Sequence, residues 1–501
     1  MSPFFLKKNI DSLIASVVGF SIIMLYTRYG GIGISPDSIA YTSVARSFVA
    51  GDGFFDYSGS PLVAFPLFYP FFLGLFMFVT QHDIVQIAPF LNGLLFATLI
   101  FLSGVLMEHF KYKTNWYKRI LLTIITFSPS LIEIYSMLWS ETLFILLVVI
   151  FILYFHKYLL NHSILSLVIA GIIAAIAFDT RYAGITLTAT GCLLIFFDKN
   201  LGWIKKTKHI LIFGSTGFSF AVINLIYNVI VSNLATGMRQ KGITPLTKNI
   251  EYSGIVLSDW FQLQIQQQLL FEVIAILIMG LFILFFVKNI NHWKSYYTYE
   301  NIAVSFFIVY VLFIVLSSTF SRYETINNRL LAPAFLPLLW ISTCQIPKWR
   351  KYMPHKQLQW IFFAFSIGIA SVLIGSYFAI NRENLSYMTE TGIPGYSEDT
   401  WKKSQIVNYL QHHDELFEKD SSIYSNHCQA VYFLTNHSIF TLPERVYLDD
   451  VKEFKETPYC LLVWFNLDNN PDLLSLKEIR KYKKMECIKS FSDGAIYVLR
   501  N

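Results

Sequence analysis

The residues with the clearest capacity for chemistry follow the first apolar segment of the chain. Pro36-Asp37-Ser38 opens a short amphipathic stretch that also carries Tyr41 and Arg46. A carboxylate such as that of Asp37 can take a proton from a reacting hydroxyl, which is the role of a general base. The planar guanidinium of Arg46 suits phosphate oxygens. The stretch therefore predicts a site that combines a base with anion binding.

Residues of the same kinds occur at the ends of three later apolar segments. They are Glu141, Arg181 with Tyr182, and Arg322 with Arg329. Charges at helix ends near a bilayer are costly unless they are paired, reach the interface or face water. One shared, water-filled cavity would satisfy them together. We expect Asp37 to be the catalytic residue and the others to bind substrate: Tyr41, Arg46, Glu141, Arg181, Tyr182, Arg322 and Arg329.

These residue types fit the transfer of a sugar from a lipid carrier. Such a donor has a polyprenyl tail in the bilayer, an anionic phosphate at the interface and a sugar in water. The reaction needs a carboxylate to deprotonate the acceptor hydroxyl, and Asp37 supplies it. It also needs guanidinium groups to hold the phosphate and stabilise the leaving charge. Arg181, Arg322 and Arg329 supply these groups.

The composition indicates an integral membrane protein. Of the 501 residues, 54% are hydrophobic and only 14% are charged, whereas about 25% are charged in a soluble domain. The net charge of +6 does not call for nucleic acid, because basic residues also orient membrane proteins. The five cysteines show neither metal-ligand spacing nor a complete disulfide framework.

Twelve apolar segments are long enough, or nearly long enough, to cross a membrane. Basic residues concentrate in cytoplasmic loops, but with twelve spans and a cytoplasmic N-terminus the clusters at 111–119, 199–208 and 348–356 would not be cytoplasmic. Treating 62–80, which Pro61 precedes and Pro66 and Pro70 interrupt, as an interfacial segment resolves the conflict. The prediction is eleven spans with a cytoplasmic N-terminus. The cytoplasmic segments then hold about twice as many basic residues as the external segments before residue 379.

The last 120 or so residues have a different character. Charged residues return, and short β-type runs occur at 422–425, 430–434, 459–465 and 495–499, with a helical stretch near 399–412. We therefore expect a transmembrane catalytic domain over 1–378, with a first external loop at 27–83. A small extracytoplasmic α/β domain would follow over 379–501.

Five short motifs between residues 30 and 335 resemble those of GT-C-type multi-spanning glycosyltransferases. That group includes protein O-mannosyltransferases and lipid A aminoarabinose transferases. The segment from Pro36-Asp37 to Gly51-Asp52-Gly53-Phe54 resembles the family's first external loop. Phe65-Pro66-Leu67-Phe68-Tyr69-Pro70 is similar to its Pro-Pro-Leu-Tyr-Pro, with Leu67 for the second proline. The others are Ser140-Glu141-Thr142-Leu143-Phe144, with Thr142 for a proline, Thr180-Arg181-Tyr182-Ala183-Gly184 and Asn328-Arg329-Leu330-Leu331-Ala332-Pro333.

The resemblance implies an all-α polytopic fold with about eleven transmembrane helices and a polyprenyl-phosphate-sugar donor. It makes Asp37 the presumed base of an inverting transfer to a glycan, lipid or protein acceptor. The protein would lie in a bacterial inner or plasma membrane, with its active site outside. The second acidic residue of protein O-mannosyltransferases is absent, since Ser38 follows Asp37, so protein O-mannosylation is not implied. No cofactor is predicted; a pyrophosphate donor would call for a divalent metal.

Simpler roles exist for several of these residues. Asp37 can be only a helix cap, Arg46 can reach lipid headgroups, and Arg181 with Tyr182 can be interface anchors. Glu141 can be an ion-pair partner rather than a catalyst. An alternative function is a transporter or a flippase for lipid-linked sugars, although transporters tend to carry polar residues at mid-helix, and most spans here are apolar there.

Overall fold

The structure is a computed structural model of the whole chain, and it describes residues 8–501 except 238–239, 323, 418–421 and 468–469. The chain forms two compact units. The helical unit comprises residues up to Arg28 together with Leu62–Ser386. The α/β unit comprises Tyr29–Pro61 together with Tyr387–Asn501.

Seven segments of the described chain are long and apolar enough to cross a membrane. Six are single helices or a helix with its terminal turn: α2 (Ile10–Tyr26), α5 (Ile84–Met107), α8 (Glu141–Asn161), α14 (Gln268–Asn291), α16 (Tyr299–Phe320) and α20 (Lys356–Thr391). The seventh, Asn328–Tyr352, is built from α17 (Asn328–Leu331), η3 (Ala332–Ala334), α18 (Phe335–Thr343) and α19 (Ile346–Tyr352).

Two further pairs of helices qualify only when each pair counts as one bent segment. They are α6 (Asn115–Thr126) with α7 (Pro129–Ser136), bent by 47°, and α11 (Trp203–Gly217) with α12 (Ser219–Ser232), bent by 44°. Pro129 opens α7 and has no backbone N–H with which to continue the helix hydrogen bonding of α6.

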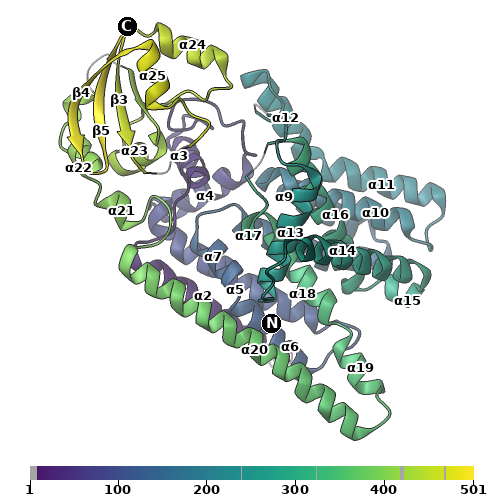
Figure 1. Cartoon of the computed structure of the whole chain (residues 1–501). Coiled ribbons are helices and arrows are strands. Elements are labelled where there is room, and N and C mark those ends of the chain that lie inside the picture. Colours follow the sequence, from purple (N-terminus) through teal and green to yellow (C-terminus); the bar gives the residue numbers. More distant parts are fainter. Residues whose placement is uncertain (1–7, 238–239, 323, 418–421, 468–469) are drawn as a thin grey trace. The chain divides into compact units, whose positions relative to one another are not determined.

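Shorter helices complete this unit (Figure 1). They are α4 (Phe68–Thr80), α9 (Ile164–Thr180), η2 (Tyr182–Gly184), α10 (Ile185–Phe197), α13 (Leu246–Trp260) and α15 (Trp293–Tyr296). Each of the eleven predicted spans corresponds to one of the long segments, to a bent pair, or to α9 or α10. The remaining apolar helix, α4, has 13 residues. It is about 20 Å long, shorter than the bilayer core of about 30 Å.

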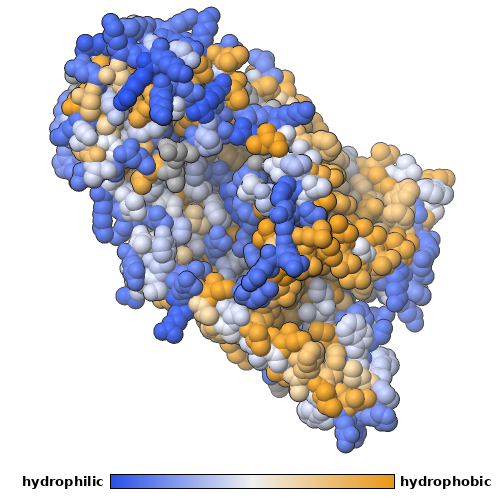
Figure 2. Space-filling model, in the orientation of Figure 1, coloured by the Kyte–Doolittle hydropathy of each residue, from blue (hydrophilic) through white to orange (hydrophobic). Residues whose placement is uncertain are grey.

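The outer surface of the helical unit is apolar, as expected for a protein in contact with lipid. On α20, Phe365 is 66% exposed and Val372 is 72% exposed, and on α14, Leu284 is 66% exposed. Figure 2 shows hydrophobic surface over the region of α14 and α20. A soluble protein rarely exposes such patches, so the chain is an integral membrane protein, as its composition predicts.

The α/β unit contains a five-stranded mixed sheet in the order β2-β1-β3-β5-β4. The strands are β1 (Ser422–Ser425), β2 (Phe440–Thr441), β3 (Tyr459–Phe465), β4 (Lys484–Phe491) and β5 (Gly494–Arg500). β1 pairs in parallel with β2 and β3, whereas β5 pairs antiparallel with β3 and β4. The apolar core includes Leu462 of β3 and Leu499 of β5, which pack with Phe454 and Ile479 from helices.

The helices of this unit are α3 (Pro36–Ala50), α21 (Asp399–Lys402), α22 (Gln405–Gln411), η4 (Asp414–Leu416), α23 (Cys428–Thr435), α24 (Leu448–Glu456) and α25 (Leu476–Tyr482). The strands expected at 422–425, 459–465 and 495–499 are present, but the strand expected at 430–434 is wrong because this segment lies in α23. There Cys428 and Val431, spaced as neighbours on one helix face, are both buried.

The segment after α2 is part of the α/β unit although it lies far from the sheet in sequence. The backbone N–H of Tyr396 donates to the carbonyl of Ile34 at 2.8 Å, and the hydroxyl of Ser397 donates to the carbonyl of Ile32 at 2.9 Å. Gly395 makes this contact possible: its φ is +90°, and an added Cβ would lie 2.1 Å from the Ile34 oxygen. Only glycine tolerates that combination of conformation and close approach.

Candidate active site

Glu141 is a fully buried carboxylate at the first residue of α8. The connection before it is fixed by buried hydrogen bonds. Asn92 of α5 donates to the carbonyls of Tyr135 and Met137 at 3.0 and 2.8 Å, and the Tyr135 hydroxyl donates to the carbonyl of Thr142 at 2.8 Å. The carboxylate lies at the positive end of the α8 dipole, which favours negative charge.

Two arginines from distant parts of the sequence bind this carboxylate. Nη1 of Arg181, the C-cap residue of α9, lies 2.5 Å from Oε1 of Glu141. Nε of Arg329, in α17, lies 2.6 Å from the same oxygen. Arg181 also donates to the hydroxyl of Ser140 at 3.0 Å, and the guanidinium of Arg329 stacks over Trp139, 4.4 Å from the ring centroid. A single oxygen thus holds two cations in fixed orientations.

A second carboxylate lies near the arginine pair, and one oxygen of Glu141 remains available. Oε1 of Glu324 lies 3.9 Å from Nη1 of Arg329, and the Glu324 side chain is 46% exposed, so water screens this pair strongly. Oε2 of Glu141 is buried and has no hydrogen-bond partner among the described residues. The cluster therefore combines two oriented guanidinium groups with a carboxylate oxygen that no described residue satisfies. These groups suit a ligand that is anionic and carries hydroxyl groups.

Tyr182 follows Arg181 and lies in a small polar network. Its hydroxyl donates to the carbonyl of Val63 at 3.2 Å and accepts from Nδ2 of Asn228 at 3.2 Å. The turn needs Gly184, because a Cβ there would lie 2.3 Å from the backbone of Ala177 in α9. This close packing fixes the direction of the Arg181-Tyr182 pair at the end of α9.

The hydrogen bonds described for Arg322 are with Gln240. Its Nη1 donates to Oε1 of Gln240 at 2.8 Å, and its backbone N–H donates to the carbonyl of the same residue at 2.9 Å. The structure thus brings together Glu141, Arg181 and Arg329, and places Arg322 on Gln240.

Asp37, Tyr41 and Arg46 all lie on α3, in the α/β unit. The interpretation of Asp37 as the helix cap is wrong: Ser35 is the N-cap and forms a capping box with Ser38, while Asp37 lies one position inside the first turn. Tyr41 is 2% exposed. Nη1 of Arg46 lies 3.5 Å from the hydroxyl of Tyr432 in α23.

Sequence inspection missed two residues of this region, Asn224 and Asn228 of α12. They are 2% and 0% exposed, and their side chains contact each other at 3.4 Å. Their spacing could have identified them, because two amides four residues apart in an apolar segment share one helix face. Polar groups within membrane segments are costly unless they have a function or a partner.

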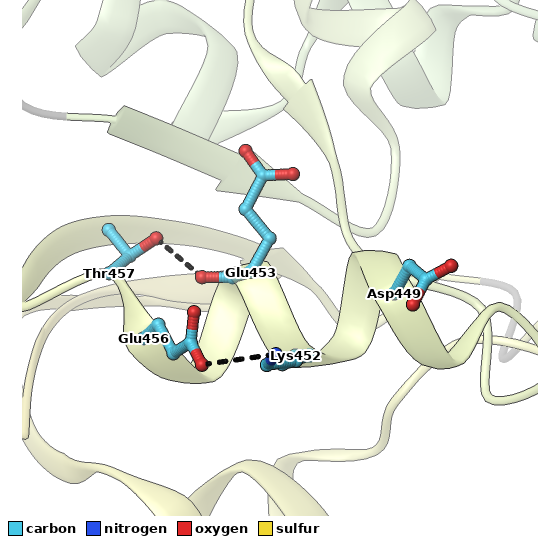
Figure 3. Close-up of a pocket in the computed structure, with 5 residues that line it drawn as sticks. All are labelled: Asp449, Lys452, Glu453, Glu456 and Thr457. Atoms are coloured by element: carbon cyan, nitrogen blue, oxygen red, sulfur yellow. Dashed lines mark hydrogen bonds and ion pairs between the residues drawn. The ribbon is translucent and has the colours of Figure 1, made fainter.

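No group of three or more His, Cys, Asp or Glu residues in the described chain could hold a metal ion. A surface pocket on α24 is lined by Asp449, Lys452, Glu453, Glu456 and Thr457. Figure 3 shows that its side chains diverge; the drawn interactions join Lys452 to Glu456 and Thr457 to the Glu453 carbonyl, one turn apart on the helix.

The fold is that of solved GT-C glycosyltransferase structures. ArnT from Cupriavidus metallidurans in the apo state aligns with a TM-score of 0.56 at 10% identity, over 98% of this chain and 97% of that chain. The oligosaccharyltransferase of Archaeoglobus fulgidus aligns with a TM-score of 0.57 at 11% identity, over 97% of this chain and 72% of that chain.

Sequence comparison adds no relative. No protein-family model matches the chain, and no curated protein matches it. At 10–11% identity the structural alignments establish the fold. They confirm the architecture expected from the motifs: a GT-C-like polytopic helical protein with a small C-terminal α/β domain.

Proposed function

We propose that this protein is a membrane glycosyltransferase that moves a sugar from a polyprenyl-phosphate donor to an acceptor hydroxyl. The observation that carries the proposal is the Glu141–Arg181–Arg329 cluster in a chain with this fold. Two solved structures with the fold support the class of donor. One is ArnT described as bound to undecaprenyl phosphate, with a TM-score of 0.55. The other is AglB described in complex with an inhibitory peptide and a dolichol-phosphate, with a TM-score of 0.54.

The arginine pair is proposed to bind the donor phosphate. Guanidinium groups donate to phosphate oxygens in a fixed planar geometry and stabilise the charge that develops on the leaving phosphate. Glu141 would act through them, since its Oε1 orients both cations. Its Oε2, which no described residue satisfies, is suited to accept a hydrogen bond from a sugar hydroxyl. We also propose Tyr182 and Arg322 as substrate-binding residues.

Asp37 is proposed as the general base, with Tyr41 and Arg46 as substrate-binding neighbours on α3. The acceptor oxygen attacks the anomeric carbon while its proton passes to the Asp37 carboxylate. The bond between the anomeric carbon and the phosphate oxygen breaks, and polyprenyl phosphate leaves with the electron pair. A single displacement of this kind inverts the anomeric configuration.

The distribution of basic residues supports the proposed orientation. We propose that the reaction takes place on the outer face of a bacterial plasma membrane, with residues 379–501 outside as well. The membrane domain would extend over 1–378 and include the first external loop at 27–83. Acceptors would be glycans, lipids or proteins that reach this face.

The test is an assay of purified protein with a panel of polyprenyl-phosphate sugars, read out as release of polyprenyl phosphate. We expect one donor to be consumed by the wild-type protein, and the double variant Arg181→Ala/Arg329→Ala to lose at least about 100-fold in rate, since each lost charged contact costs roughly a factor of ten or more. Lys205→Ala, an exposed lysine on α11, is the control. Full activity of the double variant would place the phosphate site elsewhere.

A further inference from the structure

A pocket of the helical unit, lined by residues other than those of the proposed active site, is rich in basic residues. It has a volume of about 390 Å³. It lies where α5 ends, where α6 begins, and where α19 leads into α20. Its polar and aromatic lining includes Lys111, Lys113, Trp116, Arg350, Lys351 and Gln359.

The basic residues of this pocket are only partly neutralised. Lys113 contacts Glu108, with Nζ 2.6 Å from its carbonyl and 3.7 Å from its carboxylate. Within the described residues, neither Arg350 nor Lys351 forms an ion pair with a carboxylate. Arg350 is instead held over aromatic rings, 4.1 Å from the centroid of Phe363 and 5.7 Å from that of Trp116. Cation–π contacts orient the guanidinium without removing its charge.

The surroundings of the pocket are those of a membrane–water interface. Three large aromatic side chains beside it are exposed: Trp349 by 53%, Tyr352 by 66% and Trp360 by 63%. Trp and Tyr are enriched at the level of lipid headgroups. From there α20 continues with exposed apolar side chains at Phe365 and Ile369, a surface suited to acyl chains.

We propose that this pocket binds the phosphate headgroup of an anionic membrane phospholipid. Arg350, Lys351 and Lys111 would contact the phosphate, while the acyl chains would lie along the apolar face of α20. Basic pockets between transmembrane helices bind anionic headgroups in this way. A soluble phosphate ester would use the same cations but would gain nothing from the apolar face. The site is independent of the proposed glycosyl transfer.

The experiment is native mass spectrometry of the detergent-purified full-length protein titrated with phosphatidylglycerol, and in parallel with zwitterionic phosphatidylcholine. The wild-type protein should retain phosphatidylglycerol preferentially. Arg350→Gln/Lys351→Gln should weaken its binding roughly ten- to thirty-fold, from the loss of two basic residues near the headgroup. Lys205→Gln/Lys208→Gln is the matched control. It removes the same charge from exposed positions of α11 and should bind like the wild type.

Two further arms keep the outcome decisive. Gln359→Glu adds a negative charge to the pocket without removing a cation, so it should weaken phosphatidylglycerol binding even if the double variant folds poorly. sn-Glycerol 3-phosphate at millimolar concentration should not displace the lipid. Equal binding by wild type and Gln359→Glu would overturn the proposal. So would displacement by glycerol phosphate, which would assign the pocket to a soluble phosphate ester.

Discussion

Nε of Arg329 lies 2.6 Å from Oε1 of Glu141, a contact between residues 188 positions apart. Arg181 approaches the same oxygen from the end of α9. The Arg329 side chain is 13% exposed and that of Glu141 is 1% exposed. These two contacts therefore connect α8, α9 and α17 inside the helical unit.

Removing the carboxylate of Glu141 should destabilise the helical unit. Glu141→Gln keeps the size of the side chain but leaves two guanidinium groups without their shared anion. Loss of one member of a buried ion pair costs about 3–5 kcal/mol, so the melting temperature of the purified protein should fall by several degrees. Glu324→Gln removes the half-exposed carboxylate near Arg329 and should change it little. Equal melting temperatures for both variants would contradict this account of the cluster.

Arg329→Lys should not restore full activity. Lysine keeps the positive charge but loses the planar fork and the stacking on Trp139. We expect kcat/KM for the lipid donor to fall roughly 10- to 100-fold, as for a lost hydrogen bond to a charged group. Arg322→Lys, whose Nη1 donates to the amide oxygen of Gln240, should lose less. The comparison is made by steady-state kinetics, and a larger loss at Arg322 would reverse the assignment.

Asp37→Asn should remove the general base and leave α3 intact, because Ser35 and Ser38 cap this helix. Donor binding should persist, while transfer should fall by roughly 10²–10⁴-fold. Ser35→Ala is the complementary control: it should cost about 1 kcal/mol of stability but leave the base in place. Single-turnover assays and thermal melting separate the two effects. A fully active Asp37→Asn enzyme would exclude Asp37 as the base.

The orientation of the protein can be tested with its own cysteines. Within the described chain Cys487, on β4, is the exposed cysteine, and the others are buried or partly buried. If the α/β unit is extracytoplasmic, a membrane-impermeant maleimide applied to intact cells should label the wild-type protein and not the Cys487→Ser variant. In that background Lys205→Cys should be labelled only after the membrane is permeabilised. Labelling of Lys205→Cys in intact cells would reject the eleven-span topology.

The α/β unit should lose stability in acid through Glu478. Hydrogen bonds from Arg445, then from Ser475, lower the pKa of Glu478 from 4.5 to about 2. A lowered folded-state pKa stabilises the fold above the unfolded value, and this contribution is lost as the pH falls from about 4.5 to 2. Protection factors of the sheet amides should decrease over this range and depend less on pH in Glu478→Gln. Glu456→Gln, on α24, should retain the wild-type dependence.

Local sequence predicted the membrane segments well because transfer of a helix into lipid depends on its own composition and length. Every predicted span has a helical counterpart, although two are bent and α9 and α10 are short. Local sequence failed at residues 430–434. Val431, Tyr432 and Phe433 favour strands, but packing of one helix face in the α/β unit overrides that preference.

The motifs also identified Glu141, Arg181 and Arg329 as polar residues at the ends of apolar segments. They did not predict that both arginines share one oxygen of Glu141, that Arg322 binds Gln240, or that Ser35 rather than Asp37 caps α3. Residue type and hydropathy are properties of short segments. The sequence alone therefore determined that this is an integral membrane protein and which polar residues lie at the ends of its apolar segments. Which of those residues meet depends on how helices far apart in the chain pack, and only the tertiary structure decided that.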